Sequence, residues 1–338
     1  LLVSPSCNVL PSATSQPTPK AVAQLLIKAN PNSTATPTPF QPVSPTATRQ
    51  PTTTAIPTAT RAPTATATAV PVLPTPIRVD QTLPEGVVHM LVLGNDLRPG
   101  GGYRTDVILL VSINTGKGTV GVVSFPRDLY VTLPGWGTNR INTAFTYGGF
   151  QMLADTFQYN FGVRPTYYAM TNFEGFEGII NGLGGIDVNV SQELTDSCDI
   201  HQGRNGSCTV KPGVTNMDGA MALWYVRSRH STSDFDRGRR AQEVLYAIFA
   251  KLMSINAVTR LPQVYADYRN SFETNLGIEG IVPLLPVASM VVGDSSRIHR
   301  YTIGPQEAYP ITTYGGAMVL QPNFQAIQAI VNRSMNGE

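Results

Sequence analysis

Three nearly continuous apolar runs constrain the fold of this 338-residue chain more than any other feature. They cover residues 87–93, 107–113 and 119–125 and are separated by glycine-rich or charged segments. Runs of this length and composition are typical of strands that are buried on both faces of a sheet. Segments with helical periodicity follow, interleaved with further strand-like runs. We therefore expect an α/β protein with a three-layer α-β-α architecture around a mixed central sheet.

The elements beyond the third run follow from the same two periodicities. One of them is a strand around Arg227, in which Arg227 and Arg229, two residues apart, would point to the same side. The other expected elements are helices near 150–159 (after the turn Gly148-Gly149), 173–183, 217–223, 236–253, 258–270, 278–291 and 322–333, and strands near 165–170, 186–190, 297–303 and 316–320.

Residues 1–85 differ sharply in composition from the rest of the chain. They hold sixteen of the 27 prolines and a single aromatic residue, Phe40, within repeated Pro, Thr and Ala. Such a segment buries too little apolar surface to offset its ordering entropy, so we expect a disordered extracellular stalk. The apolar start Leu1-Leu2-Val3 suggests an upstream membrane anchor, although no run approaches the roughly 20 apolar residues of a span. The remaining residues, 86–338, are expected to form one domain.

The charge of the predicted domain disfavours nucleic acid as a partner. Of the 24 Lys/Arg and 22 Asp/Glu in the chain, five and two fall within residues 1–85, which leaves 19 basic and 20 acidic residues in 86–338. A domain that binds a general polyanion usually carries a larger basic excess. The arginines of this domain are therefore clustered rather than abundant.

That cluster is the segment 227–240, which contains five arginines within fourteen residues together with Asp234 and Asp236. Its second half opens the amphipathic helix expected at 236–253. Arginines at a helix N-terminus are unfavourable unless an anion is present, whereas an anion there would meet backbone N–H groups and several guanidinium groups together. The segment therefore indicates a phosphate or pyrophosphate site. The alternative is a solvated charged face in which the two aspartates neutralise the arginines.

The three cysteines have different expected roles. Cys198 and Cys208 flank a short polar loop, which favours a disulfide formed in an oxidising compartment. Metal binding by these cysteines with His201 is the weaker alternative. Cys7 remains as a free or lipidated thiol.

The chemistry of the predicted site follows from which residue types are present and which are missing. The chain contains no Gly-x-Ser-x-Gly, His-Glu-x-x-His or phosphate-binding Gly-Lys-Thr motif, and it has only four histidines. His89 lies within a predicted strand, where a hydrogen-bonded core histidine is expected. Arginines and aspartates instead follow the predicted strands, at Asp96, Arg98, Arg104, Asp106, Arg127 and Asp128. Arginine binds phosphate oxygens and paired carboxylates bind Mg²⁺, which together suit phosphoryl transfer.

Several short segments, in order along the chain, resemble the signatures of the LytR-CpsA-Psr family. The matching segments are Gly94-Asn95-Asp96-Leu97-Arg98, Arg104-Thr105-Asp106, Ser124-Phe125-Pro126-Arg127-Asp128, Arg140-Ile141-Asn142, Leu183-Gly184-Gly185-Ile186-Asp187-Val188, Asp218-Gly219, Ala222-Leu223 and Arg227-Ser228-Arg229 with Asp234, Phe235, Arg237 and Arg240. Each match is weak alone, but the ordered series is specific.

The resemblance implies an extracytoplasmic, membrane-anchored enzyme of the cell envelope. It would transfer a glycopolymer phosphate from a polyprenyl pyrophosphate carrier to peptidoglycan and use Mg²⁺ or Mn²⁺. It would hold the lipid tail in an apolar groove, lined here by the helices near 150–160 (Phe150, Met152, Leu153, Phe157) and 173–183 (Phe173, Phe176, Ile179, Ile180, Leu183), although plain core packing is an alternative for each of these residues. By motif, Asp96 and Asp106 would hold the metal. Catalysis would rest on Asp106, Arg104, Arg127, Arg227 and Arg229. The pyrophosphate would be bound by Arg98, Arg104, Arg127, Arg227, Arg229, Arg237, Arg240 and Gln242, with Asp234 in support.

One position departs from the family pattern, which places glutamine directly after the arginine at 240. This chain has Ala241 followed by Gln242, so either Gln242 takes over the contact or one ligand contact is missing. Two other functions also fit the same residues. One is a polyprenyl-pyrophosphate phosphatase in which water replaces the acceptor, and the other is a non-catalytic protein that binds wall polymer or another polyanion.

Overall fold

The computed structural model of the chain describes residues 85–96, 104–229, 234–254 and 261–338, all within the compact unit Pro71–Glu338. The predicted stalk, Cys7 and Arg98 lie outside these residues, as does the side chain of Asp234. No helix within the described ranges has the length and apolar character needed to cross a bilayer.

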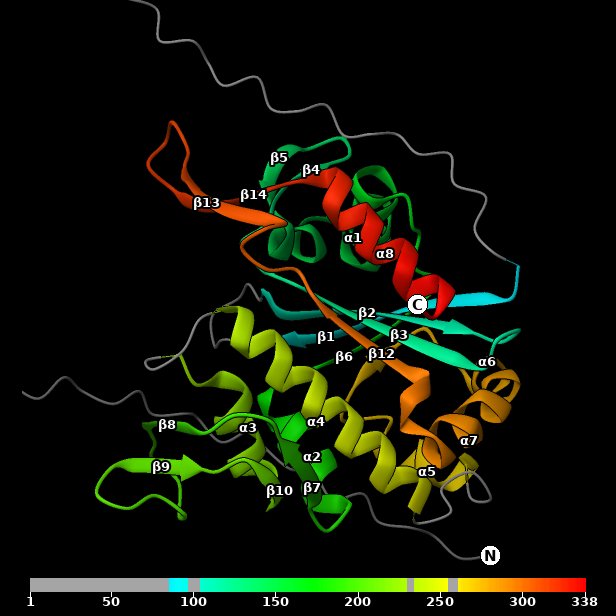
Figure 1. The fold of residues 1–338 in the computed structure, drawn as a ribbon, viewed down its shortest axis with the longest axis vertical. Helices are drawn as coiled ribbons and strands as arrows, with labels where there is room; N and C mark the ends of the chain where they lie inside the picture. Colours follow the sequence, from blue (N-terminus) through cyan, green and yellow to red (C-terminus); the bar gives the residue numbers. More distant parts are fainter. Residues whose placement is uncertain (1–84, 97–103, 230–233, 255–260) are drawn as a thin grey trace, which may run out of the picture. The chain divides into compact units, whose positions relative to one another are not determined.

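A six-stranded mixed sheet forms the centre of this unit, as the sequence predicts (Figure 1). Its strand order is β11-β6-β1-β2-β3-β12, and β1 pairs antiparallel with β2 and parallel with β6. The three apolar runs therefore become neighbouring central strands. The bounds are β1 Val87–Asn95, β2 Thr105–Asn114, β3 Thr119–Phe125, β6 Tyr167–Thr171, β11 Glu273–Thr274 and β12 Ile298–Thr302.

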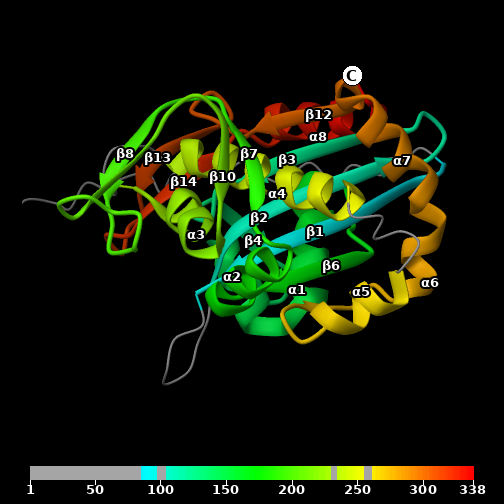
Figure 2. The ribbon, with the colours of Figure 1, turned by 90° about the horizontal axis from the view of Figure 1, so that it is seen from below.

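Helices cover both faces of this sheet (Figure 1). On one face lie α1 (Ala144–Phe161) and α8 (Phe324–Asn336). The other face carries α2 (Phe173–Gly182), α3 (Gly219–Arg227) and α4 (Asp234–Ser254), with α5 (Leu261–Tyr268), α6 (Ile278–Ile281) and α7 (Leu285–Gly293) beside them (Figure 2). The expected turn Gly148-Gly149 is a kink inside α1, where Gly149 has a φ of 62°.

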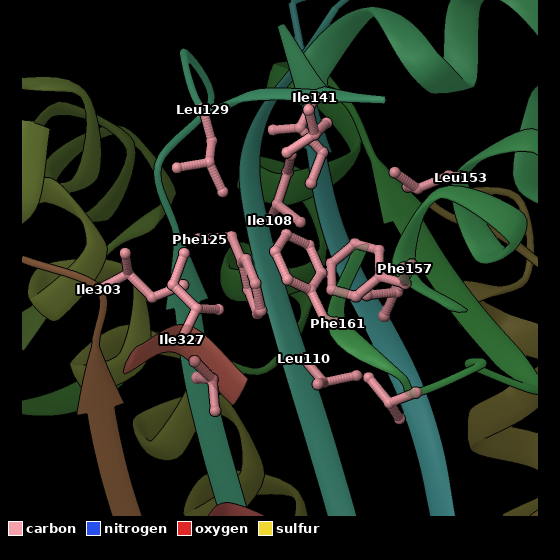
Figure 3. Close-up of a cluster of buried hydrophobic side chains, with 14 of the residues drawn as sticks. Ile108, Leu110, Phe125, Leu129, Ile141, Leu153, Phe157, Phe161, Ile303 and Ile327 are labelled. Carbon is pink, nitrogen blue, oxygen red and sulfur yellow. The ribbon is translucent and has the colours of Figure 1, made fainter. Parts of the chain in front are cut away.

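The core under α1 consists of interlocking aromatic rings (Figure 3). Phe125 of β3 packs against Phe157 and Phe161 of α1 at ring-centroid distances of 4.8 and 5.0 Å. Phe157 and Leu153 are fully buried in this cluster, and Phe150 and Met152 pack against it. The expectation that α1 lines a lipid groove is therefore wrong. Helical periodicity identifies an apolar face but not the side of the sheet on which that face packs.

The helix expected at 217–223 is confirmed as α3, but the strand expected around Arg227 is wrong, because α3 continues through Val226 to Arg227. Asp218 begins this helix by accepting a hydrogen bond from the backbone N–H of Met221 at 2.9 Å. A short apolar run suits either a strand or a buried helix, and here the helix cap decides between them.

The remaining short elements are mostly hairpins. Two of their strands, β7 and β14, were expected near 186–190 and 316–320. The sequence analysis missed the other six, because they are short and their periodicity is weak. The bounds are β4 Tyr130–Leu133, β5 Gly137–Arg140, β7 Ile186–Val190, β8 Leu194–Ser197, β9 Ser207–Val210, β10 Gly213–Met217, β13 Ala308–Thr312 and β14 Met318–Pro322, and the short 3₁₀ helices are η1 Ile141–Thr143, η2 Val282–Leu284 and η3 Ser295–Arg297.

A disulfide joins Cys198 to Cys208 across the hairpin β8–β9, with the two Cα atoms 5.6 Å apart. Both sulfur atoms are used in this bond, and the described residues contain no group of three or more His, Cys, Asp or Glu side chains that could hold a metal ion, so metal binding with His201 has no support. The hairpin is held against helix α3 at two points, because Gln202 donates to the N-cap residue Asp218 at 2.6 Å and the Trp224 indole donates to the Ser197 carbonyl at 2.9 Å.

We expect the double variant Cys198→Ser/Cys208→Ser to lose roughly 2–3 kcal/mol of unfolding free energy, because closing a loop of this size restricts the unfolded chain. Chemical denaturation of the two proteins measures the difference. Free thiols at both positions in non-reduced protein from an oxidising compartment would contradict the pairing.

Candidate active site

The site lies where β1 and β3 end and β2 begins, and a β-bulge marks it. Gly94 pairs with Val107 and Asn95 pairs with Thr105, so Asp106 is an extra residue without a partner on β1. A bulge of this kind redirects a side chain and is often found next to active sites. Asp96 lies just beyond the end of β1, where its carboxylate accepts a hydrogen bond from the backbone N–H of Arg104 at 2.9 Å.

Asp106 connects two of the predicted arginines. Its Oδ1 lies 3.0 Å from Nη1 of Arg127, and its Oδ2 lies 3.5 Å from Nη2 of Arg229. Arg127 follows β3 and Arg229 follows α3, so a single carboxylate holds together the ends of three separate segments. Charge-assisted contacts of this type fix guanidinium orientation as well as position.

Further ion pairs extend the charged network from Arg127 through Asp128 to Arg140. Nε of Arg127 lies 3.4 Å from Asp128, and the other carboxylate oxygen of Asp128 lies 3.1 Å from Nε of Arg140. Arg140 also donates to the Met318 carbonyl at 2.8 Å. The hairpin β4–β5 and strand β14 are therefore tied to the same charged network.

Arg227 approaches the site from a different direction, as the last residue of α3. Its guanidinium carbon lies 4.2 Å from the centroid of the Phe173 ring. Its side chain makes no ion pair with a carboxylate within the described part of the chain. A cation held over an aromatic ring keeps its charge available to an anionic ligand.

A cavity of about 1050 Å³ opens from these charged residues and runs between the sheet and helix α4. Its size is at the upper end for ligand pockets. Phe173, Phe176 and Ile179 of α2 line it as predicted, whereas Ile180 and Leu183 pack in the neighbouring core. Its apolar wall also includes Val111, Leu245, Phe249, Leu285 and Val291.

Most of the predicted site residues converge on this cavity. The predicted charged residues that line it are Asp96, Asp106, Arg127, Arg227, Arg229 and Arg237. Arg104 is exposed and does not line the cavity, although its backbone positions Asp96. The predicted convergence from three segments is therefore confirmed for all described members except Arg104.

Two residues predicted to bind pyrophosphate are held by the protein itself. Arg240 is fully buried, and its Nη2 donates to the Ser228 carbonyl at 2.5 Å, between Arg227 and Arg229. Burial lowers the pKa of this guanidinium. Arg240 is therefore placed to position the two neighbouring arginines rather than to touch a ligand. Gln242 is buried at the cavity wall, and its Nε2 donates to the Tyr301 carbonyl at 2.7 Å.

Helix α4 can approach the site closely because residue 238 is glycine. A Cβ atom at Gly238 would lie 2.2 Å from Oγ of Ser124 on β3. The small space beside this contact is lined by Asp106, Arg237 and Ala241. Close packing of helix on strand therefore brings the first turns of α4 to the carboxylate.

The sequence analysis missed Arg300, which lines the cavity from β12 with its guanidinium 5.0 Å from the Tyr246 ring centroid. The available signal was the spacing of Ile298, Arg300 and Thr302, which places all three on one face of a predicted strand. His89, in contrast, is the core histidine that was expected. Its Nδ1 lies 3.0 Å from Oγ of Ser112, and burial lowers its pKa to about 4.

Comparison with solved structures places this architecture among known folds. The crystal structure of TagV from Bacillus subtilis matches with a TM-score of 0.61 at 23% identity, over 74% of this chain and 97% of that one. The structure of TagT bound to LIIa-WTA matches with a TM-score of 0.59 at 24% identity, over 78% and 96%. Similarity at this identity concerns the fold alone.

Sequence comparison provides the closer relationships. The regulatory protein MsrR of Staphylococcus aureus (strain COL) is 34% identical over 200 residues, which is 58% of this chain and 59% of MsrR. The chain thus spans about three fifths of the length of that relative. TagT of Bacillus subtilis (strain 168), a polyisoprenyl-teichoic acid–peptidoglycan teichoic acid transferase, is 30% identical over 226 residues, 65% of this chain and 70% of TagT.

A family model matches residues 53–335, and this span includes all the ordered signatures, the bulged Asp106 and the apolar cavity behind it. The chain therefore belongs to the LytR_cpsA_psr family.

Proposed function

We propose that the protein transfers a glycopolymer phosphate from a polyprenyl pyrophosphate carrier to peptidoglycan. The observation that supports this proposal is that the charged site residues lie at the mouth of a long apolar cavity. The apolar part suits a polyprenyl chain, and the arginines at the mouth suit its pyrophosphate. The name of TagT, a teichoic acid–peptidoglycan transferase, supports the same class of acceptor and donor.

In the proposed reaction, a hydroxyl oxygen of the acceptor forms a bond to the sugar-linked phosphorus. The bond between that phosphorus and the bridging oxygen breaks, the hydroxyl proton passes to solvent water, and polyprenyl phosphate leaves with the bonding electrons. Arg127, Arg227 and Arg229 stabilise the negative charge that grows on the leaving phosphate. Asp106 holds two of these guanidinium groups in place.

The proposed cofactor is Mg²⁺ or Mn²⁺. Asp96 and Asp106 come from adjacent strand ends, and two carboxylates suit a cation that keeps several waters and binds substrate phosphate. When bound, the ion would neutralise phosphate charge. Phosphotransfer is expected to stop when the divalent cations are chelated and to return when Mg²⁺ is added.

The proposed location is the outer face of the membrane, with a membrane anchor upstream of residue 1. A disulfide between Cys198 and Cys208 is consistent with an oxidising compartment. Nucleic acid is not a proposed partner, because the paired carboxylates at the mouth would repel a polyanion that lacks a bound cation.

The decisive experiment supplies a polyprenyl-pyrophosphate-linked glycopolymer with and without peptidoglycan and follows both phosphorus products. We expect covalent attachment to peptidoglycan together with released polyprenyl phosphate. Equal release of polyprenyl phosphate without an acceptor, and no attachment with it, would make a phosphatase the better description. Binding of wall polymer without any turnover would favour the non-catalytic alternative.

A further inference from the structure

Trp136 and Tyr147 form an exposed pair of stacked aromatic rings on the side of the sheet that carries α1. Their centroids are 4.8 Å apart and their planes differ by 4°. Trp136 remains 61% exposed and Tyr147 41% exposed. Because Tyr147 covers one face of the indole, the exposed area of Trp136 must come from the opposite face and the ring edges.

The protein holds this pair in place without covering it. Trp136 lies in the turn of the hairpin β4–β5, where its backbone N–H donates to the Leu133 carbonyl at 3.0 Å. Gly135 and Gly137 on either side have left-handed φ values of 80° and 93°, and a Cβ atom at either position would meet nothing within 4 Å. The side chain of Asn139 donates to the Tyr147 hydroxyl at 3.3 Å, which fixes the second ring.

A pair that served only to pack the hairpin on α1 would bury both rings, because burial of apolar area is what stabilises such a contact. This pair instead presents a flat ring face to solvent. The face of an aromatic ring carries partial negative charge, and the C–H bonds on the face of a pyranose ring carry partial positive charge. A sugar ring is therefore the ligand whose shape and polarity match the open face of Trp136.

The platform is joined to the active-site network by its own hairpin. Strand β5 runs four residues from the turn to Arg140, about 14 Å at the rise of an extended strand. Arg140 pairs with Asp128, which pairs with Arg127 at the cavity mouth. A saccharide of a few residues that stacks on Trp136 can therefore extend along the hairpin toward Arg127.

We propose that Trp136 and Tyr147 form a docking platform for the glycan strand of the acceptor, a chain of β-1,4-linked pyranoses. This inference rests on the proposed transfer to peptidoglycan and assigns the acceptor a binding surface separate from the lipid cavity. The stacked rings provide affinity for the sugar faces, and the hairpin directs the strand to the site.

The two tryptophans of the chain make a direct binding test feasible. Trp224 is 8% exposed, and its indole donates to the Ser197 carbonyl. Changes in tryptophan emission on adding a β-1,4-linked N-acetylglucosamine tetramer therefore report mainly on Trp136. We expect a saturable change that is absent in Trp136→Ala and retained in Tyr314→Ala, a matched control at another exposed aromatic residue.

The catalytic test separates the acceptor from the donor. Trp136→Ala should raise the KM for peptidoglycan roughly three- to tenfold, the effect of losing one aromatic stacking contact, while the KM for the lipid-linked donor stays unchanged. Trp136→Phe should restore most of the affinity. An unchanged KM and no emission change with the tetramer would overturn the platform. A normal emission change with the tetramer but no turnover on any acceptor would support the platform and contradict the proposed transfer.

Discussion

Replacing Asp106 by alanine is expected to lower kcat at least about 100-fold without unfolding the protein. Asp106 contacts both Arg127 and Arg229, and it provides one of two carboxylates for the proposed cation. Its loss removes a preorganised charge arrangement, and removing one such group from an active site typically costs about 10²–10³ in rate. Single-turnover measurements on the lipid-linked donor determine the loss.

Asp155→Ala is the matched control for Asp106→Ala. Asp155 also forms an ion pair with an arginine, Arg164, but it lies on α1 away from the cavity. We expect this variant to keep normal turnover, and thermal unfolding of both variants checks that the fold persists. Wild-type turnover in Asp106→Ala would remove the bulged carboxylate from the mechanism.

Arg227→Ala is expected to reduce kcat by about 10²–10³, with a smaller effect on KM. The physical reason is that negative charge grows on the leaving phosphate during transfer, so a cation at the mouth binds the transition state more tightly than the ground state. Arg227 is suited to this role because it is exposed at the cavity and held over Phe173. Arg227→Lys should recover only part of the rate, because lysine lacks the planar fork.

Two other arginines serve as controls for Arg227. Arg204 is exposed in the disulfide hairpin, so Arg204→Ala should leave both turnover and stability unchanged. Arg239 belongs to the same arginine-rich segment as Arg227, but its Nη1 lies 2.7 Å from the buried Glu243. Arg239→Ala should therefore lower stability and spare kcat. Loss of activity in Arg239→Ala with full activity in Arg227→Ala would indicate a basic docking surface instead.

The sequence by itself determined the central sheet and the chemical class of the site. Residues 87–93, 107–113 and 119–125 are apolar on both faces, and only a sheet covered on both sides accommodates such strands. The helix expected at 236–253 appears as α4, which begins only two residues earlier. The presence of arginine and aspartate after successive strands was also visible in the sequence, because strand ends and polar residue types are local properties.

Only the tertiary structure decided how these parts are used. It buried Arg240 against the Ser228 carbonyl, placed α1 on the sheet face opposite α4 and the cavity, and continued helix α3 to Arg227, where a strand was expected. It also placed Asp106 in a bulge, which depends on the register between β1 and β2. Local periodicity specifies which face of an element is apolar. The partner of that face, and the register of each strand, depend on contacts between residues that are distant in the sequence.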